Sequence, residues 1–400
     1  MLTEAISKTS NPRILGLDLL RGYFMFMIIV NHIGRFPSIY DIFTGRGLFW
    51  VSAAEGFFMI AGLLIGYVYG PKFINNAKKT TKKLWLRSGK LYLWSVFFTL
   101  LFTLLGLIAG MPPGTKPGLL QTNIFNLIYQ TLTLHYVYGW ADFLVRFVVF
   151  IFFAPIALYF ITKNKWWLVL IASCLIWIFR GNSFNMAWQI LFFVGIILGY
   201  YLPTIEKRFN NLNKSLRTCL RYSVISLACL LISFNAILIY FSIALKNPSS
   251  YISTLPNPYS TYIASLNTFY NYTGMLFEKN SLGIGRLILD VICFLALYFI
   301  VRKNEIFINK MSLGFFETLG KRPLFIYCLS AVIIYPLQIL IMPLPSNIIY
   351  NFILDTVILS IIYLAARYRD CLIRTFKTCK ASIFENIYII YRRKVRFEND

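Results

Sequence analysis

Histidine and acidic residues are scarce in this chain of 400 residues. Against 39 Lys and Arg there are 15 Asp and Glu and 2 histidines, His32 and His135. The sequence also has no His-Glu-x-x-His, Cys-x-x-Cys or Gly-x-Ser-x-Gly motif. Zinc sites draw mainly on histidine and cysteine, so we expect no metal site. The usual sequence sign of a serine hydrolase is missing as well.

Charge of either sign is also scarce. Charged residues make up 14% of the chain and hydrophobic residues 58%, whereas soluble domains average about 25% charged and about 45–50% apolar residues. Most of the apolar residues lie in continuous runs, and most of these runs are long enough to cross about 30 Å of hydrocarbon as a helix. We therefore predict an all-α fold, a polytopic bundle of transmembrane helices.

About ten spans are expected. The fifth is the weakest, because its 14 residues are few for a full crossing. Residues 1–370 would form one integral-membrane domain, and the basic and aromatic residues 371–400 a cytoplasmic tail along the membrane interface. The predicted spans are 14–33, 49–69, 91–109, 143–162, 166–179, 186–203, 222–245, 287–301, 323–341 and 348–366.

Basic residues are distributed unevenly between the two sides of these spans. With a cytoplasmic N-terminus, 30 of the 39 Lys and Arg fall in inner segments and 7 in outer loops. This asymmetry follows the positive-inside rule and predicts that both termini are cytoplasmic. The densest inner segment is the predicted loop 71–90. The net charge of +24 is then explained by orientation and by contact with membrane lipids, so no nucleic-acid partner is needed.

Three ionisable residues share one stripe of the first span. A helix turns about 100° per residue, so the eleven steps from Arg21 return His32 to within about 20° of it, about 16 Å further along the axis. Asp18 lies one turn before Arg21 on nearly the same side. Because ionisable groups inside a membrane are costly unless they face protein or a water-filled cavity, this stripe is a candidate functional site.

Other polar residues could complete such a site. Glu55 in the second span lies at a depth between Arg21 and His32 and could pair with either, although an Arg21–Glu55 ion pair that only locks two helices is an alternative. Asp142 and Arg146 have the spacing of a structural helix pair. Asp142 and His135, near the outer side, are also candidates for binding substrate, although His135 could be an incidental loop residue.

Several stretches resemble a known family. LDLLRGYFMFMIIVNH has Arg, ten residues and then His, and is similar to the integral-membrane acyltransferase 3 superfamily. VSAAEGFFMIAGLLIGYVYG resembles the second span of its OpgC-like branch, which succinylates osmoregulated periplasmic glucans. Ser52 stands where that branch often has Asp, and Val145 where it often has Pro. Weaker resemblances lie in ADFLVRFVVFIFFAPIAL, NMAWQILFFVGIILGY and LGKRPLFIYCLS.

The resemblance implies an acyltransferase of the bacterial inner membrane. It would move an acyl group, succinyl in the OpgC-like branch, from cytoplasmic acyl-CoA to a hydroxyl of an extracytoplasmic glycan, without a bound cofactor. His32 matches the catalytic histidine and Arg21 its partner, and Glu55 and Asp142 match acidic positions. We expect His32, Arg21 and Glu55 to be catalytic, and Asp18, Asp142 and His135 to bind substrate.

Two other functions stay open from the sequence alone. A glycan or lipid transporter could line its pathway with the same charged stripe and form no bond. A membrane anchor or assembly partner is a further alternative, although an anchor has no need of buried charge.

Overall fold

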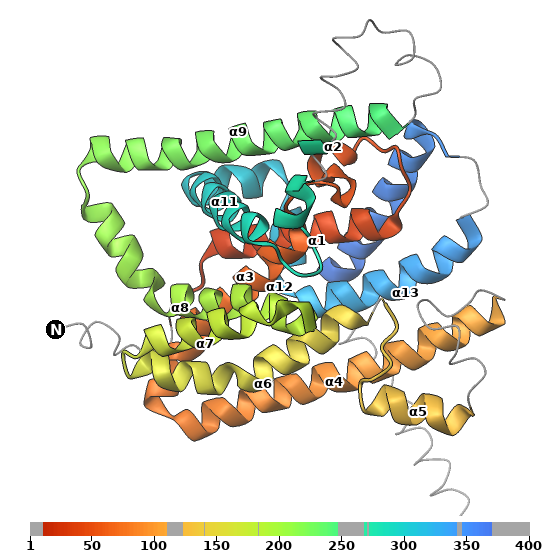
Figure 1. Cartoon of the computed structure of the whole chain (residues 1–400), viewed down its shortest axis with the longest axis horizontal. Coiled ribbons are helices and arrows are strands. Elements are labelled where there is room, and N and C mark those ends of the chain that lie inside the picture. The colour runs from red at the N-terminus through yellow and green to blue at the C-terminus, as the bar shows by residue number, and fades with distance from the viewer. Residues whose placement is uncertain are drawn as a thin grey trace, which may run out of the picture.

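The computed structural model describes residues 11–109, 123–139, 141–182, 184–246, 268–269, 272–341 and 346–369. The predicted tail 371–400 lies outside them. Nine helices in these ranges are long and apolar enough to cross a membrane, which confirms the predicted all-α bundle (Figure 1). They are α1 (Leu15–Ile33), α3 (Ala53–Asn75), α4 (Ala77–Ile108), α6 (Asp142–Thr162), α8 (Phe184–Asn211), α9 (Lys214–Lys246), α11 (Ile284–Met311), α13 (Pro323–Ile341) and the helix Ile348–Arg369.

The fifth predicted span is the short helix α7 (Trp166–Ile178). Its 13 residues rise only about 20 Å, less than the hydrocarbon thickness of about 30 Å. The other short helices are α2 (Asp41–Thr44), α5 (Ile124–Leu132) and α12 (Phe315–Lys321).

The prediction of a loop at 71–90 is wrong. α3 runs to Asn75 and α4 begins at Ala77, so most of this basic stretch is helical. The break is a single residue, Asn76, whose side chain caps α4 by accepting a hydrogen bond from the backbone N–H of Lys79 at 2.8 Å. The apolar runs marked the part of each helix that lies in hydrocarbon, whereas good helix formers such as lysine continue it beyond the membrane core.

The segments predicted to face inward meet at one end of the bundle, which we call the basic end. Tyr67 near the end of α3 donates to the carbonyl oxygen of Pro12 at 2.8 Å. Tyr201 of α8 donates to Asn164 in the turn between α6 and α7 at 2.9 Å, and Arg302 of α11 pairs with Glu206 of α8 at 3.0 Å. The start of α1 and one end of each of α3, α6, α8 and α11 thus lie together.

Glycines bring α3 and α8 into backbone contact. A Cβ on Gly62 or Gly66 of α3 would lie 2.0 Å from a backbone oxygen of α8, and one on Gly199 of α8 would lie 1.9 Å from the oxygen of Leu63. Such close approach requires glycine on both helices. These glycines therefore have a structural role.

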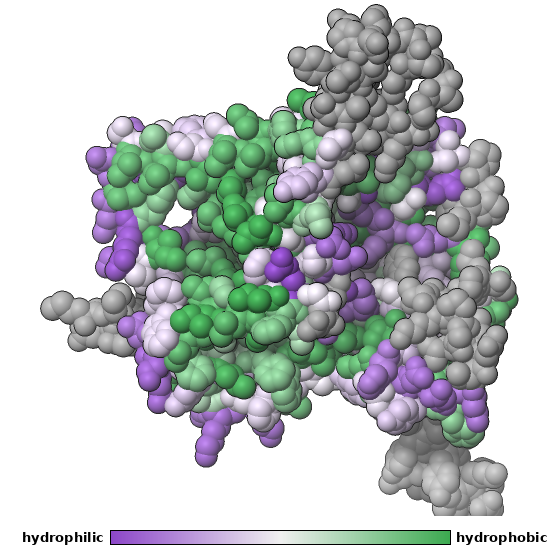
Figure 2. All heavy atoms as spheres, viewed as in Figure 1, coloured by the Kyte–Doolittle hydropathy of each residue, from purple (hydrophilic) through white to green (hydrophobic). Residues whose placement is uncertain are grey.

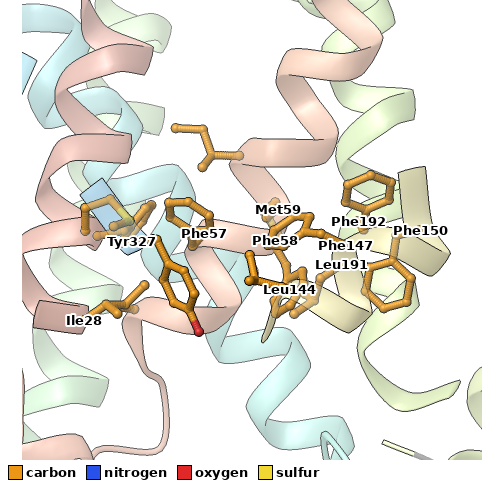
Figure 3. Close-up of a cluster of buried hydrophobic side chains, with 14 of the residues drawn as sticks. Ile28, Phe57, Phe58, Met59, Leu144, Phe147, Phe150, Leu191, Phe192 and Tyr327 are labelled. Carbon is orange, nitrogen blue, oxygen red and sulfur yellow. The ribbon is translucent and has the colours of Figure 1, made fainter. Parts of the chain in front are cut away.

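Aromatic side chains fill the layer between α3, α6 and α8. Figure 3 shows Phe58, Phe147, Phe150 and Phe192 from these helices packed together, with Tyr327 beside Phe57. The rings of Phe58 and Phe147 stack with centroids 4.6 Å apart. On the outside of the bundle, hydrophobic residues cover much of the face shown in Figure 2, as expected for a surface in contact with lipid.

Candidate active site

A cavity of about 390 Å³ lies beside the first two turns of α1 and reaches the first turn of α6. Its wall is formed by α1, α3, α4, α6, α13 and residues 11–14. The charged residues in the wall are Arg13, Asp18, Arg21 and Arg87, three cations and one anion. The cavity therefore favours a ligand that carries negative charge.

Asp18 holds two of these cations. Its Oδ1 accepts a hydrogen bond from Nη2 of Arg21 at 3.0 Å, and its Oδ2 accepts one from Nε of Arg13 at 2.5 Å. The second bond raises the pKa of Arg13. Nε of Arg21 is buried and has no hydrogen-bond partner among the described residues. Because an unsatisfied buried donor is costly, Arg21 is ready to donate to a ligand in the cavity.

The short helix α12 supports α1 at the level of Asp18. A Cβ on Gly320 would lie 1.8 Å from the backbone oxygen of Asp18, and one on Gly22 would lie 1.8 Å from the backbone oxygen of Phe316. Two glycines, one on each helix, therefore let the two backbones touch. This contact fixes the depth and rotation of α1 where it carries Asp18 and Arg21.

His32 lies at the other end of α1 from the cavity. Because α1 is one unbroken helix from Leu15 to Ile33, the predicted stripe of Arg21 and His32 and their axial separation of about 16 Å both hold. Nε2 of Gln338 in α13 donates to the backbone oxygen of His32 at 2.7 Å. This hydrogen bond ties the end of α1 to α13, while the imidazole is partly exposed.

The first turn of α6 borders the cavity. The ring of Phe143 in this turn packs against the ring of Tyr327 in α13, with centroids 5.4 Å apart. Phe143 and Tyr327 both line the cavity.

The expected pairing of Glu55 with Arg21 or His32 is wrong in this structure. Glu55 pairs instead with Arg286 of α11, Nε to Oε1 at 2.5 Å, and both residues are at least 97% buried. Glu55 also caps the start of α3 by accepting from the backbone N–H of Ser52 at 2.9 Å. These bonds occupy both carboxylate oxygens. The catalytic role assigned to Glu55 stays a prediction.

The remaining predicted residues, Asp142 and His135, lie at the start of α6 and shortly before it. Asp142 begins α6 and pairs with Arg146 at 2.6 Å, as the spacing predicted. His135 is exposed between α5 and α6, and its Nδ1 lies 3.0 Å from the hydroxyl of Thr133. Their roles in binding substrate stay predictions.

Sequence reasoning missed Arg286, Arg87 and Tyr327. Arg286 lies just before the predicted span 287–301, but α11 begins at Ile284 and buries it. In the sequence, Arg87 is only one of several charges in the basic stretch 71–90. Tyr327 gave no signal, since one tyrosine in an apolar helix resembles a core residue. Among the described residues there is no group of three or more His, Cys, Asp or Glu that could hold a metal.

Comparison with known proteins now adds the family. Residues 13–373 match the family model described as OpgC protein. No match was found among curated proteins or solved structures. The family match covers nearly the whole bundle, including α1, α3 and the cavity between them. The chain is therefore a multi-pass membrane protein that belongs to the OpgC family.

Proposed function

We propose that this protein is an O-acyltransferase of the bacterial inner membrane. It would move an acyl group from cytoplasmic acyl-CoA to a hydroxyl of an extracytoplasmic glycan. One observation carries the proposal: Arg21, with its unsatisfied Nε in a cationic cavity, shares a helical stripe with His32 on the unbroken helix α1. Membership of the OpgC family supports a glucan as the acceptor.

The cavity is the proposed donor site. Acyl-CoA is polyanionic at its nucleotide end and carries its thioester at the tip of a long, flexible arm. Arg87 and Arg13 line the cavity near the basic end and suit the phosphates. The cavity is otherwise lined mainly by apolar and aromatic residues such as Leu91, Phe147 and Leu324, which suit the arm.

Arg21 and His32 would act on different parts of the bound donor. About 16 Å separates them along α1, and helical side chains lean towards the N-terminus, so one carbonyl group cannot easily contact both. Arg21, held by Asp18, would bind a carbonyl of the arm. The thioester would lie further along the stripe, near His32.

His32 would be the general base. It takes the proton from the acceptor hydroxyl while the hydroxyl oxygen attacks the thioester carbonyl. The new C–O bond forms, the C–S bond breaks, and the thiolate of coenzyme A leaves with the proton that His32 returns. Asp142, predicted to bind substrate, would accept hydrogen bonds from the sugar hydroxyls of the acceptor.

Acyl transfer by the full-length protein in liposomes tests the proposal. The protein is supplied with radiolabelled succinyl-CoA or acetyl-CoA and with a periplasmic-type glucan, and labelled glucan is counted. We expect label in the wild type and in Lys165→Ala, a surface control at the basic end, but almost none in His32→Ala.

The same vesicles test the alternative that the protein is a glycan transporter. If unmodified glucan crosses the bilayer equally fast in the wild type and in His32→Ala, and no labelled glucan forms with either donor, the acyltransferase is refuted.

A further inference from the structure

The proposed reaction does not use a buried group of charges on α3 and α11. It consists of Glu55, Arg286 and Asp290, which are 0%, 3% and 3% exposed. Glu55 and Arg286 form the ion pair described above. Nη1 of Arg286 donates to the backbone oxygen of Phe277 at 3.3 Å. Asp290 lies one turn further along α11. The group therefore contains two carboxyl side chains and one guanidinium.

Two atoms of this group have no hydrogen-bond partner among the described residues. They are Nη2 of Arg286, a donor, and Oδ2 of Asp290, an acceptor. Residues four apart lie on the same face of a helix, so the side chains of Arg286 and Asp290 project from the same side of α11. Leaving such groups unsatisfied away from water costs free energy comparable to a lost hydrogen bond.

Asp290 also lines a second cavity, of about 400 Å³. This volume lies within the usual range of small-molecule sites, about 300–1,000 Å³. The wall is formed by α1, α3, α9, α11 and the segment that precedes α3, and it is mostly apolar. Its members include Tyr23, Phe24, Met27, Phe43, Ile225, Ala228, Cys229, Ile232, Phe294, Leu297 and Ile300.

The second cavity is distinct from the proposed active site. Tyr23 and Met27 of α1 line it, and they lie about 160° and about 120° around the helix from Arg21. The donor cavity is lined by Asp18 and Arg21 on a different side of α1. A ligand in the second cavity would therefore contact α1 without occupying the donor site.

The polar and apolar parts of this cavity are separated along the membrane normal. Ser52 precedes the first turn of α3, and Asp290 is in the second turn of α11, both at the end of the bundle opposite the basic end. Leu297 and Ile300 lie about 10 Å and about 15 Å deeper along α11. The cavity thus has a polar outer end and an apolar inner end, as an amphiphile does.

We propose that the second cavity binds a neutral lipid alcohol from the membrane. Its hydrocarbon chain lies between α9 and α11, and its hydroxyl group meets Asp290. Asp290 lines the cavity, and a hydroxyl can donate to its unsatisfied Oδ2. An ether or a plain hydrocarbon has no proton to donate and would leave Oδ2 of Asp290 unsatisfied.

Ligand-dependent thermal stability of the purified full-length protein in detergent tests this proposal. The probes are 1-tetradecanol and its methyl ether, which share the chain but differ in the ability to donate. We expect the alcohol to raise the melting temperature with a half-saturating concentration about fivefold lower than that of the ether, the effect of one net hydrogen bond.

Three variants locate the effect. Asp290→Leu should abolish the preference for the alcohol. Cys229→Trp, at an exposed edge of the cavity, should abolish stabilisation by both probes, and it serves if the Asp290 variant does not fold. Ala172→Trp is the matched control, because Ala172 lines a different apolar cavity between α6, α7 and α8, and it should leave the response unchanged.

Three outcomes would overturn the proposal. They are equal effects of alcohol and ether on the wild type, an unchanged response in Cys229→Trp, and no stabilisation by either probe. A photoreactive tetradecanol gives an independent measurement, since it should label peptides of α9 and α11 in the wild type and fail to do so in Cys229→Trp.

Discussion

Gly320 touches the backbone oxygen of Asp18 so closely that a methyl group on it would lie 1.8 Å from that oxygen. The first prediction follows from this contact. Gly320→Ala must push α12 away from α1, at a cost typical of overpacking, about 1–3 kcal/mol. We expect a lower melting temperature and, because Asp18 positions Arg21, a higher KM for acyl-CoA.

Gly89→Ala is the control for this substitution. Gly89 lies inside α4, and nothing would contact its Cβ within 4 Å. Alanine there should be neutral or stabilise by up to about 1 kcal/mol. If Gly320→Ala behaved in the same way, the contact between α12 and α1 would not matter for stability.

The second prediction separates the roles of the two ends of α1. His32→Ala should lower kcat by about 10²–10⁴, the usual contribution of a general base, without changing the melting temperature by more than a degree or two. Arg21→Ala should act mainly on the KM for acyl-CoA. Steady-state kinetics in liposomes measure both, and a pure KM effect in His32→Ala would contradict the assignment.

The third prediction concerns the pair of Glu55 and Arg286. Removing one partner of a buried ion pair typically costs about 3–5 kcal/mol, because the other charge remains buried. Glu55→Ala and Arg286→Ala should each strongly lower the free energy of unfolding. The double variant should lose less than the sum of the two single losses. Unfolding of all three variants measures the coupling. Lys321→Ala is the control, because the side chains of Lys321 and its partner Glu317 are 41% and 23% exposed and such a pair is worth at most about 1 kcal/mol.

Activity of these variants then tests the predicted catalytic role of Glu55. If the role is only structural, Arg286→Ala should lose the same share of activity as Glu55→Ala. A much larger loss of activity in Glu55→Ala would support a catalytic role for Glu55.

The fourth prediction is a pH dependence at α12. The ion pair with Lys321, and then the hydrogen bond from Asn309 at 2.9 Å, lower the pKa of Glu317. A carboxyl group whose folded pKa is depressed stabilises the fold above its unfolded pKa, and this is lost as the pH falls through the folded value. Glu317→Gln should therefore lower the melting temperature at pH 7, by the equivalent of less than about 1 kcal/mol, and this effect should be smaller at pH 3. An equal effect at both pH values would mean that charge is not involved.

Much of the architecture could be predicted from the sequence because hydrocarbon imposes simple rules. Span length and the distribution of lysine and arginine depend on local composition, so the helices and the basic end agree with prediction. The stripe of Arg21 and His32 followed from helical periodicity alone. The partner of Glu55 could not be found in this way, because it depends on which helix packs beside α3. The predicted span also began at residue 287, three residues after the observed start of α11, and so left Arg286 outside the helix.

The shortness of α7 has a consequence for the membrane itself. Tryptophans prefer the interface between lipid and water, and α7 carries Trp166 at one end and Trp177, beneath the guanidinium of Arg180 at 4.1 Å, near the other. These anchors are about 16 Å apart along the helix. We therefore expect lipid beside α7 to thin towards that spacing. The bilayer around this protein would then be asymmetric, thinner along the side of α7 than beside the long helix α9.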